Sequence, residues 1–339
     1  MAPAPTSNVK IAFGCMTFGR AGVEQARVHD IDECRAILDI FASHGHTELD
    51  TARMYGSGSS EEYLGQMGLA DASKSAFRIA TKNFPSARLP VIKMDAYDHS
   101  AKDIARCIED SLRALQTDSV DLYYLHAPDR QTPFAETLKA LDDQYRLGRF
   151  QRWGLSNYTA AEVEQILDLC DKNGWIKPTV YQGVYNAITR SAEPELFPVL
   201  RRHRMAFYAF NPLGGGLFTG ALARDAAVEA GSRFDPDRVQ GQMYRKRYWN
   251  DTYFDALDQI RAVADKHGLT MAEIALRWMT HHSQLHRDHG DAILIGASST
   301  RHIEQNLKDL EKGPLDPDVV AAVDRAWESV KPHAPPYHH

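Results

Sequence analysis

Short runs of apolar residues alternate along the chain with longer stretches in which apolar positions recur at helical spacing. A short apolar run is typical of a buried strand, and the spacing of Ile104, Ile108, Leu112 and Leu115 is typical of an amphipathic helix. The apolar runs predict eight strands, over residues 11–18, 46–50, 77–82, 120–126, 152–156, 180–185, 205–210 and 292–296.

The alternation of strands and helices predicts an α/β fold, in which helical crossovers connect parallel strands. Eight strands with helical returns favour a closed (β/α)8 barrel, the TIM barrel, formed by residues 1–339 as a single domain. An open doubly wound sheet is the alternative. However, no GxGxxG motif follows the early strands, and the glycines at 214–216 come too late in the chain for that fingerprint.

Two segments depart from the alternation. Residues from about 214 to 266 are polar and aromatic in turn, and we expect them to form one long lid loop late in the chain. The proline-rich tail at about 331–339 is expected to be extended and not helical, either draped over the barrel or loose.

Composition narrows the class of protein. With 43% hydrophobic and 25% charged residues, the 339-residue chain resembles an ordinary soluble globular protein, not a disordered or fibrous protein. A net charge of -6 without a long basic run argues against a nucleic-acid or membrane partner and favours a small-molecule one. The first residues lack a secretory or transit pattern, which predicts a cytoplasmic protein.

No metal site is expected. The four cysteines are widely spaced and form no CxxC pair. Histidine pairs stand at 281–282 and 338–339, but neighbouring side chains on a helix diverge by roughly 100°, so the first pair cannot readily share an ion.

Ionisable residues follow three successive predicted strands. Asp50, Lys82 and His126 stand at the strand ends, and Tyr55 lies in the loop after Asp50. Each alone has a structural interpretation: a helix cap, a salt-bridge partner or a core histidine. Because the carboxyl ends of barrel strands form one mouth, the four converge on one small volume, where buried ionisable groups call for a functional reason.

Proton transfer could be that reason. A free tyrosine has a pKa of about 10, and an adjacent ammonium such as Lys82 is expected to lower it. Asp50 would keep Lys82 charged, and His126 could bind a substrate oxygen or relay the proton donated by Tyr55. None of these groups carries a hydride, so a redox reaction would require an organic cofactor.

The stretches ELDTARMYGSGSSEEYLG, RIATK, VDLYYLHAPD, RWGLSNY, TVYQGVYN and YAFNPLGGGLFTG resemble aldo-keto reductases. The resemblance runs from Gly14 to about residue 310, and HGDAILIGASS with EQNL resembles the aflatoxin-aldehyde and succinic-semialdehyde reductase branch. It implies NADPH-dependent reduction of aldehydes, ketones or dialdehydes to alcohols, detoxification among its uses. It further implies that Asp50, Tyr55, Lys82 and His126 form the catalytic tetrad.

The resemblance also implies an NADPH/NADP+ site. Ser156, Asn157 and Gln182 would hydrogen-bond the nicotinamide carboxamide, and Phe210 would stack on its ring, although Phe210 could also be plain core. The backbone over residues 211–217 would follow the pyrophosphate, where glycines permit close approach or simply form a turn. The full expected cofactor set is Met16, Asp50, Ser156, Asn157, Gln182, Phe210, Asn211, Pro212, Leu213, Gly215, Gly216, Leu217, Ser298, Arg301, His302, Gln305 and Asn306.

The 2′-phosphate of NADPH is expected at the N-terminus of the helix that follows the last predicted strand. Ser298 and Ser299 open a helix whose N-terminus is a natural anion site, and Arg301 and His302 lie in its first turn. The family's commoner pattern has lysine at the strand end and arginine four residues before the asparagine. Here Ala297 or Ser298 and then His302 stand at those positions, and Arg301 is expected to compensate.

Substrate contacts are expected from Met54, Tyr55, His126 and Arg247. An arginine at position 247 could bind a substrate carboxylate, or it could be a solvated surface charge. Relatives in this branch usually end with a basic residue that reaches the pocket, and this chain does not. A homodimer is expected by analogy only.

Two other functions remain open. A cofactor-sensing regulatory subunit of the potassium-channel β-subunit type would share the barrel and the tetrad. A Schiff-base aldolase would use Lys82 as its nucleophile, since a lysine at a barrel strand end can do that chemistry.

Overall fold

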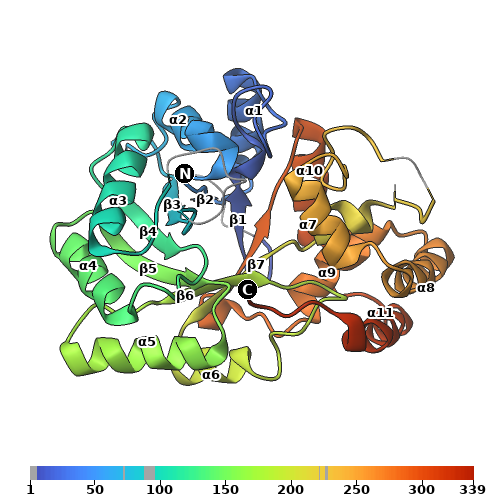
Figure 1. Ribbon diagram of the computed structural model, residues 1–339. Helices are drawn as coiled ribbons and strands as arrows, with labels where there is room; N and C mark the ends of the chain where they lie inside the picture. The colour runs from blue at the N-terminus through green and yellow to red at the C-terminus, as the bar shows by residue number, and fades with distance from the viewer. Residues whose placement is uncertain (1–5, 72, 88–95, 221, 226–227) are drawn as a thin grey trace.

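Eight parallel strands close into a barrel in chain order. The computed structural model describes residues 6–71, 73–87, 96–220, 222–225 and 228–339, and its helices surround the barrel (Figure 1). The strands are β1 Lys10–Gly14, β2 Glu48–Asp50, β3 Arg78–Asn83, β4 Val120–Leu125, β5 Phe150–Ser156, β6 Val180–Val184, β7 Ala206–Phe210 and β8 Ala292–Ile295. The predicted TIM barrel is confirmed.

Each return helix buries one apolar face against the barrel. In α3, Ile104, Ile108 and Leu112 lie on the buried side, as their spacing predicts. The α-helices are α1 Ile31–Ser43, α2 Ser59–Gln66, α3 Ala101–Leu115, α4 Phe134–Arg146, α5 Ala160–Asn173, α6 Leu196–Arg202, α7 Val239–Tyr248, α8 Asp251–His267, α9 Met271–His281, α10 Thr300–Leu310 and α11 Pro317–Val330. The 3-10 turns are η1 Cys15–Thr17, η2 Tyr55–Gly58, η3 Gly214–Thr219, η4 Arg287–His289 and η5 Lys331–His333.

Two hydrophobic clusters hold the fold together. A small cluster fills the barrel interior, with Leu122, Tyr124 and Val180 among its members. A much larger one lies between the strands and the helical layer. The interior of the barrel is therefore filled by side chains and is not an open pore.

The predicted strands are present, with shifted ends. The largest shift is in the first strand, which was expected to reach residue 18 but ends at Gly14, where η1 begins. The chain turns there because the Thr17 hydroxyl donates to the carbonyl of Ala297, beyond the end of β8, at 2.8 Å. This contact ties η1, which contains Met16, to the segment that follows β8.

The segment 214–266 is not one long loop, so that prediction was wrong. It contains η3, all of α7 and most of α8. The side chain of Asn250 caps α8 by accepting from the Tyr253 amide, and Gly268 ends it in a left-handed conformation. The polar sequence of α7 conceals its helical character, because only one side of it, with Tyr244 and Tyr248, is buried.

The C-terminal tail is draped over the barrel and packed. Its first residues, Lys331–His333, form the short 3-10 helix η5, so the expectation that the tail is not helical was wrong there. After the short turn η5, the Tyr337 side chain is buried; its hydroxyl donates to Glu195 at 3.1 Å and accepts from the Ala160 amide at 3.0 Å. The His339 amide donates to the carbonyl of Asn157 at 3.1 Å. Among the helices of the described residues, none combines the length and apolar character needed to cross a bilayer.

Candidate active site

The four ionisable residues expected to act together lie at the carboxyl-end mouth of the barrel. Asp50 ends β2, Lys82 lies near the end of β3, His126 follows β4, and Tyr55 opens η2. The Lys82 Nζ is 4.8 Å from the centre of the Tyr55 ring, and the Tyr55 and His126 rings meet edge-on at 5.6 Å. The structure thus brings the four together, while their catalytic role stays a prediction.

Lys82 is the centre of this group. Its side chain is fully buried, and its ammonium donates to the Asp50 carboxylate, to the carbonyl of Thr51 at 2.7 Å and to the Tyr55 hydroxyl at 3.5 Å. The other Asp50 oxygen accepts from the Gln182 amide at 2.8 Å. All three hydrogens of the ammonium therefore have partners, and the ion pair is oriented from both sides.

The pKa values of this group are set mainly by burial. Burial lowers the pKa of Lys82 and raises that of Asp50, and the ion pair between them opposes both shifts. Burial also raises the pKa of the Tyr55 phenol well above its usual range, and the Asp50 charge adds to this. The expected net lowering of the Tyr55 pKa is therefore not found, because burial outweighs the effect of the nearby Lys82 ammonium. Tyr55 carries its proton at neutral pH, which is the form that a proton donor needs.

His126 is a neutral imidazole. Burial lowers its pKa well below the usual value, and the Lys82 charge lowers it further. Its Nδ1 is buried without a hydrogen-bond partner among the described residues. The ring stands between the Tyr55 and Phe84 rings, edge-on to both. A neutral ring fixed in this way can donate a hydrogen bond to a carbonyl oxygen without taking up the proton that this oxygen is to receive.

The expected carboxamide-binding residues lie beside this group, at the ends of β5 and β6. The Asn157 amide donates to the carbonyl of His126 at 2.9 Å and to the Ser156 hydroxyl at 3.0 Å. Asn157 has a φ of 67°, a left-handed conformation that asparagine tolerates. Ser156, Asn157 and Gln182 are all buried next to the ionisable group, where the resemblance expects the nicotinamide.

The glycine turn η3 follows β7 and Phe210, which lies half-buried at the mouth. A Cβ on Gly215 would lie 2.1 Å from the Tyr244 ring, whereas one on Gly216 would meet nothing within 4 Å. Gly215 is therefore needed for the packing of α7 on this turn, and Gly216 is the glycine beside open space. Tyr244 also donates to the Asn211 side chain at 2.9 Å, and the Asn211 Nδ2 is buried without a partner in the described part of the chain.

The rest of this segment is more deeply packed. Pro212 and Leu217 are buried, Leu217 in the main core, and Leu213 is half-buried. Because these side chains are packed in the protein, only the backbone of these residues is free to lie along a bound ligand. Met16 lies opposite, half-buried, and its sulfur accepts from the Gln240 amide at 3.6 Å.

The expected phosphate site at the start of α10 has the predicted local structure. Ser299 caps the helix by accepting from the His302 amide, and the Ser298 hydroxyl lies 3.2 Å from the His302 Nδ1. Arg301 is exposed and has no ion pair within the described ranges. Two further expected residues bond within the protein: Asn306 donates to the carbonyl of Gly296, and Gln305 donates to Asp309.

Two arginines near this mouth were missed by sequence reasoning. Arg27, before α1, donates to Gln240 at 3.3 Å, and the Arg233 guanidinium lies 3.6 Å from where a Cβ on Gly296 would be. Burial and the charge of Arg233 lower the pKa of Arg27 to about 10. The Nε atoms of both are buried without a partner in the part of the chain that the structure describes. Such orphaned cationic donors fit an anionic nucleotide, but two loop arginines far apart in sequence leave no local signal.

The expected substrate side of the mouth is formed by the lid and the tail. Arg247 of α7 is half-buried and has no ion pair with any described residue. Burial and the nearby Arg247 charge lower the pKa of the His339 ring to about 4. His339 in turn contributes to the lowered pKa of His126. Met54 is half-buried next to Tyr55. Sequence reasoning missed His339, because only the packing of Tyr337 brings the tail here.

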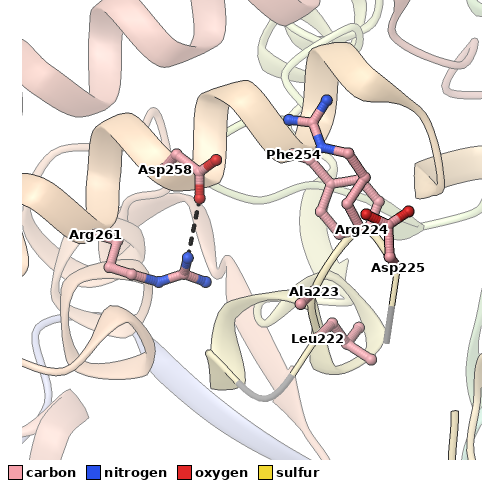
Figure 2. Close-up of a pocket in the computed structure, with 7 residues that line it drawn as sticks. All are labelled: Leu222, Ala223, Arg224, Asp225, Phe254, Asp258 and Arg261. Carbon is pink, nitrogen blue, oxygen red and sulfur yellow. Dashed lines mark hydrogen bonds and ion pairs between the residues drawn. The ribbon is translucent and has the colours of Figure 1, made fainter. Parts of the chain in front are cut away.

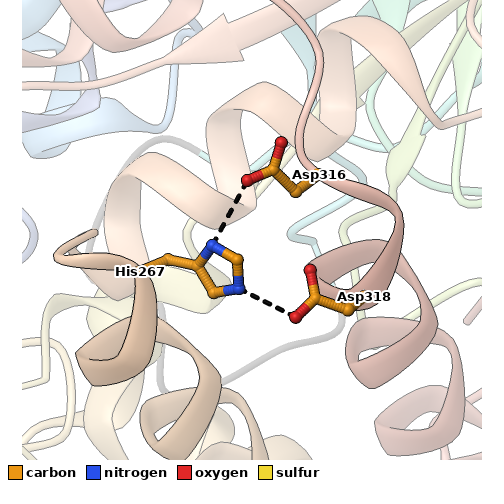
Figure 3. A group of neighbouring side chains, drawn as sticks. All are labelled: His267, Asp316 and Asp318. Carbon is orange, nitrogen blue, oxygen red and sulfur yellow. Dashed lines mark hydrogen bonds and ion pairs between the residues drawn. The ribbon is translucent and has the colours of Figure 1, made fainter.

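Two other features of the structure lie apart from these residues. A surface cavity of about 450 Å³ between residues 222–225 and α8 is lined by Arg224 and Arg261, and both are ion-paired with neighbouring aspartates (Figure 2). The His267 ring stands between Asp316 and Asp318, at 3.2 and 2.8 Å (Figure 3). The two carboxylates contact opposite ring nitrogens, so this group fastens α8 to α11 and is poorly arranged to share one ion.

Comparisons with known proteins agree with the geometry. The model of the aldo/keto reductase family matches residues 10–328. An aldo-keto reductase of Pseudocercospora fijiensis is 46% identical over 89% of this chain and 99% of its own length. The aldo-keto reductase pigE of Monascus ruber is 42% identical over 99% of both chains. Human aldo-keto reductase family 7 member A3 is 43% identical over 93% of this chain and 95% of its own.

Proposed function

Since the chain belongs to the aldo/keto reductase family and is an NAD(P)-dependent oxidoreductase of carbonyl compounds, we propose that it reduces aldehydes with NADPH, with Tyr55 as the proton donor. The observation that carries this proposal is the convergence of Asp50, Lys82, Tyr55 and His126 at one end of the barrel. Relatives named aflatoxin B1 aldehyde reductases, from human and mouse, support an aldehyde substrate.

Each of the four residues has a separate role in the proposed reaction. His126, neutral and fixed between two rings, accepts no proton and orients the carbonyl oxygen by a hydrogen bond. Tyr55 donates its proton to that oxygen as negative charge develops there. Lys82, 3.5 Å from the hydroxyl, stabilises the phenolate that remains, and Asp50 keeps Lys82 charged. A bound nicotinamide would supply the hydride to the carbonyl carbon.

The buried groups fit NADPH. Ser156, Asn157 and Gln182 would hold the carboxamide beside Asp50, and Phe210 would stack on the ring. Arg27 and Arg233 would face the pyrophosphate, since the Nε atom of each is a buried donor without a partner among the described residues. The N-terminus of α10 with Ser298, Arg301 and His302 would take the 2′-phosphate. A fluorescence titration that compares NADPH with NADH tests this preference.

The substrate proposal is an aldehyde held between Met54, the lid and the tail. Arg247 has no ion pair with any described residue, so it offers a free charge for an acidic group on the substrate. A higher kcat/KM for an aldehyde with a carboxylate than for its neutral analogue, lost in Arg247→Met, would support this. Equal values in the wild type would exclude it. A cytoplasmic location and a homodimer stay predictions.

The function can be tested by the turnover of 4-nitrobenzaldehyde, which is measured as the loss of NADPH absorbance. The wild type should turn over steadily, and Tyr55→Phe should lose roughly a hundredfold or more in kcat. Binding of NADPH without steady turnover of aldehydes would favour a cofactor-sensing subunit instead. Borohydride trapping of a substrate on Lys82 would favour an aldolase.

A further inference from the structure

A buried polar group lies directly behind the turn that carries Tyr55. It consists of Glu61 of α2, Arg53 of the loop after β2, and Thr81 of β3. The Glu61 side chain is fully buried. One of its carboxylate oxygens is ion-paired with Arg53, and the other accepts from the Thr81 hydroxyl at 2.5 Å. Glu61 thus bridges the loop and the strand on the side away from the Lys82 ammonium, which also bonds this loop.

The two partners of Glu61 flank the residues that would transfer the proton. Arg53 precedes Tyr55 by two positions, and Thr81 is the neighbour of Lys82. Because side chains alternate along a strand, Lys82 faces the barrel mouth and Thr81 faces the helical layer. The Glu61 bridge therefore connects, from behind, the two segments that set the distance of 3.5 Å between the Tyr55 hydroxyl and the Lys82 Nζ.

The turn η2 is built around the Arg53 side chain. Gly56, Ser57 and Gly58 have φ values of 55°, 52° and 88°, so the chain reverses over three left-handed residues. A Cβ on Gly58 would lie 2.0 Å from an Arg53 guanidinium nitrogen, which means that the guanidinium packs directly on this backbone. Arg53 cannot move without displacing the turn that begins at Tyr55.

The charges of this group are not explained by stability. Burial lowers the pKa of Arg53, but the charge and the hydrogen bond of Glu61, with contributions from Tyr97 and Cys107, together raise that pKa overall. A buried ion pair is usually no more stabilising than apolar side chains of the same volume, and its benefit is a defined geometry. The neighbouring pair Arg20–Glu62 is more exposed and does not connect the loop of Tyr55 to β3.

We propose that Glu61 is a positioning residue for proton transfer: through Arg53 and Thr81 it holds the Tyr55 hydroxyl against Lys82. This inference rests on the proposed function. The loop backbone is held to β3 at Thr51 and Arg53, ahead of Tyr55: the Thr51 amide donates to Ala80 at 2.8 Å, the Arg53 amide donates to Lys82 at 3.2 Å, and the Thr51 carbonyl accepts from the Lys82 ammonium at 2.7 Å. None of these bonds holds the Arg53 side chain on which the turn packs.

The experiment compares Glu61→Gln with the matched control Glu62→Gln, in the full-length enzyme saturated with NADPH. Glu61→Gln should lower kcat by about ten- to a hundredfold, because small displacements of a reacting group are costly. The KM of the aldehyde and the Kd of NADPH should stay within about twofold of the wild-type values, since neither ligand contacts Glu61. Glu62→Gln should leave kcat unchanged.

A cycle with Tyr55→Phe separates positioning from general damage. If Glu61 acts through Tyr55, adding Glu61→Gln to Tyr55→Phe should lower the residual rate by less than twofold, because the group it positions is gone. Additive losses would contradict the proposal, as would a normal kcat in folded Glu61→Gln. A wild-type rate in Tyr55→Phe itself would instead refute the proposed function.

A second variant guards against misfolding. Glu61→Gln leaves the Arg53 charge buried without its counter-charge, and loss of one charge of a buried pair destabilises proteins strongly. Thr81→Val keeps the ion pair and removes only the bond from Glu61 to β3. It should also lower kcat with the Kd of NADPH unchanged, and an unaltered kcat in Thr81→Val would overturn the role given to that bond.

Discussion

Replacing Lys82 by methionine tests the electrostatics of the site through protein stability. In the wild type the Lys82 ammonium is fully buried and bonds the Asp50 carboxylate, whose side chain is 5% exposed. Lys82→Met has nearly the same length and leaves Asp50 buried, with the Gln182 amide as its remaining side-chain hydrogen-bond donor among the described residues. Breaking a buried pair in this way costs about 3–5 kcal/mol when the remaining group stays charged.

The pH dependence gives this prediction its sign. Burial already raises the pKa of Asp50, and Lys82 opposes the shift. Without Lys82 the folded-state pKa rises further above the unfolded value of about 3.9, so the folded variant binds more protons than the unfolded chain. Its free energy of unfolding should therefore fall by up to ~1.4 kcal/mol per pH unit as the pH rises through that interval.

The assay is urea unfolding followed by tryptophan fluorescence at about pH 5 and about pH 8. Lys82→Met should be destabilised more at the higher pH, by at least about 1.5 kcal/mol. The control Lys139→Met removes an exposed pair with Asp143 and should change little at either pH. An equal loss for Lys82→Met at both pH values would refute the assignment of the buried ion pair.

Three further predictions address the rest of the account. Thr159→Ala removes one half of the capping box that Thr159 and Glu162 form at the start of α5, and should cost about 1 kcal/mol in urea unfolding with kcat unchanged; an unaltered midpoint would contradict the cap. Arg301→Met should weaken NADPH binding by about tenfold in a fluorescence titration while NADH binding stays the same, and a parallel loss for both would place the 2′-phosphate elsewhere. Because burial lowers the pKa of His126 and raises that of Tyr55, kcat/KM for reduction should stay flat between about pH 6 and pH 8; a titration in that range would mean that one of them ionises there.

The barrel and the strand-end residues were predictable because their signals are local. Strands buried on both faces give short continuous apolar runs, so β4, with Leu122 and Leu125, can be recognised in sequence. The order of the strands then places Asp50, Lys82 and His126 at the same end. The four-residue group needed only the fold class and the positions of the strand ends.

Other features depend on contacts that no local pattern records. The α7 helix has a polar sequence because only one side of it is buried, so its sequence pattern predicts a loop. Arg27 and Arg233 meet the same mouth from loops far apart in the chain. The upward shift in the pKa of Tyr55 depends on how much water the site excludes, which residue identity does not reveal.

The most direct test of the central claim is a single turnover in the NADPH-loaded enzyme. Wild type and Tyr55→Phe would each be held in excess over NADPH, so that the bound cofactor reacts only once, and mixed with excess 4-nitrobenzaldehyde while the loss of NADPH fluorescence is recorded. The account predicts that both bind NADPH within about twofold of each other and that Tyr55→Phe oxidises it at least about a hundredfold more slowly. Oxidation at the wild-type rate in Tyr55→Phe would contradict the assignment of Tyr55 as the proton donor.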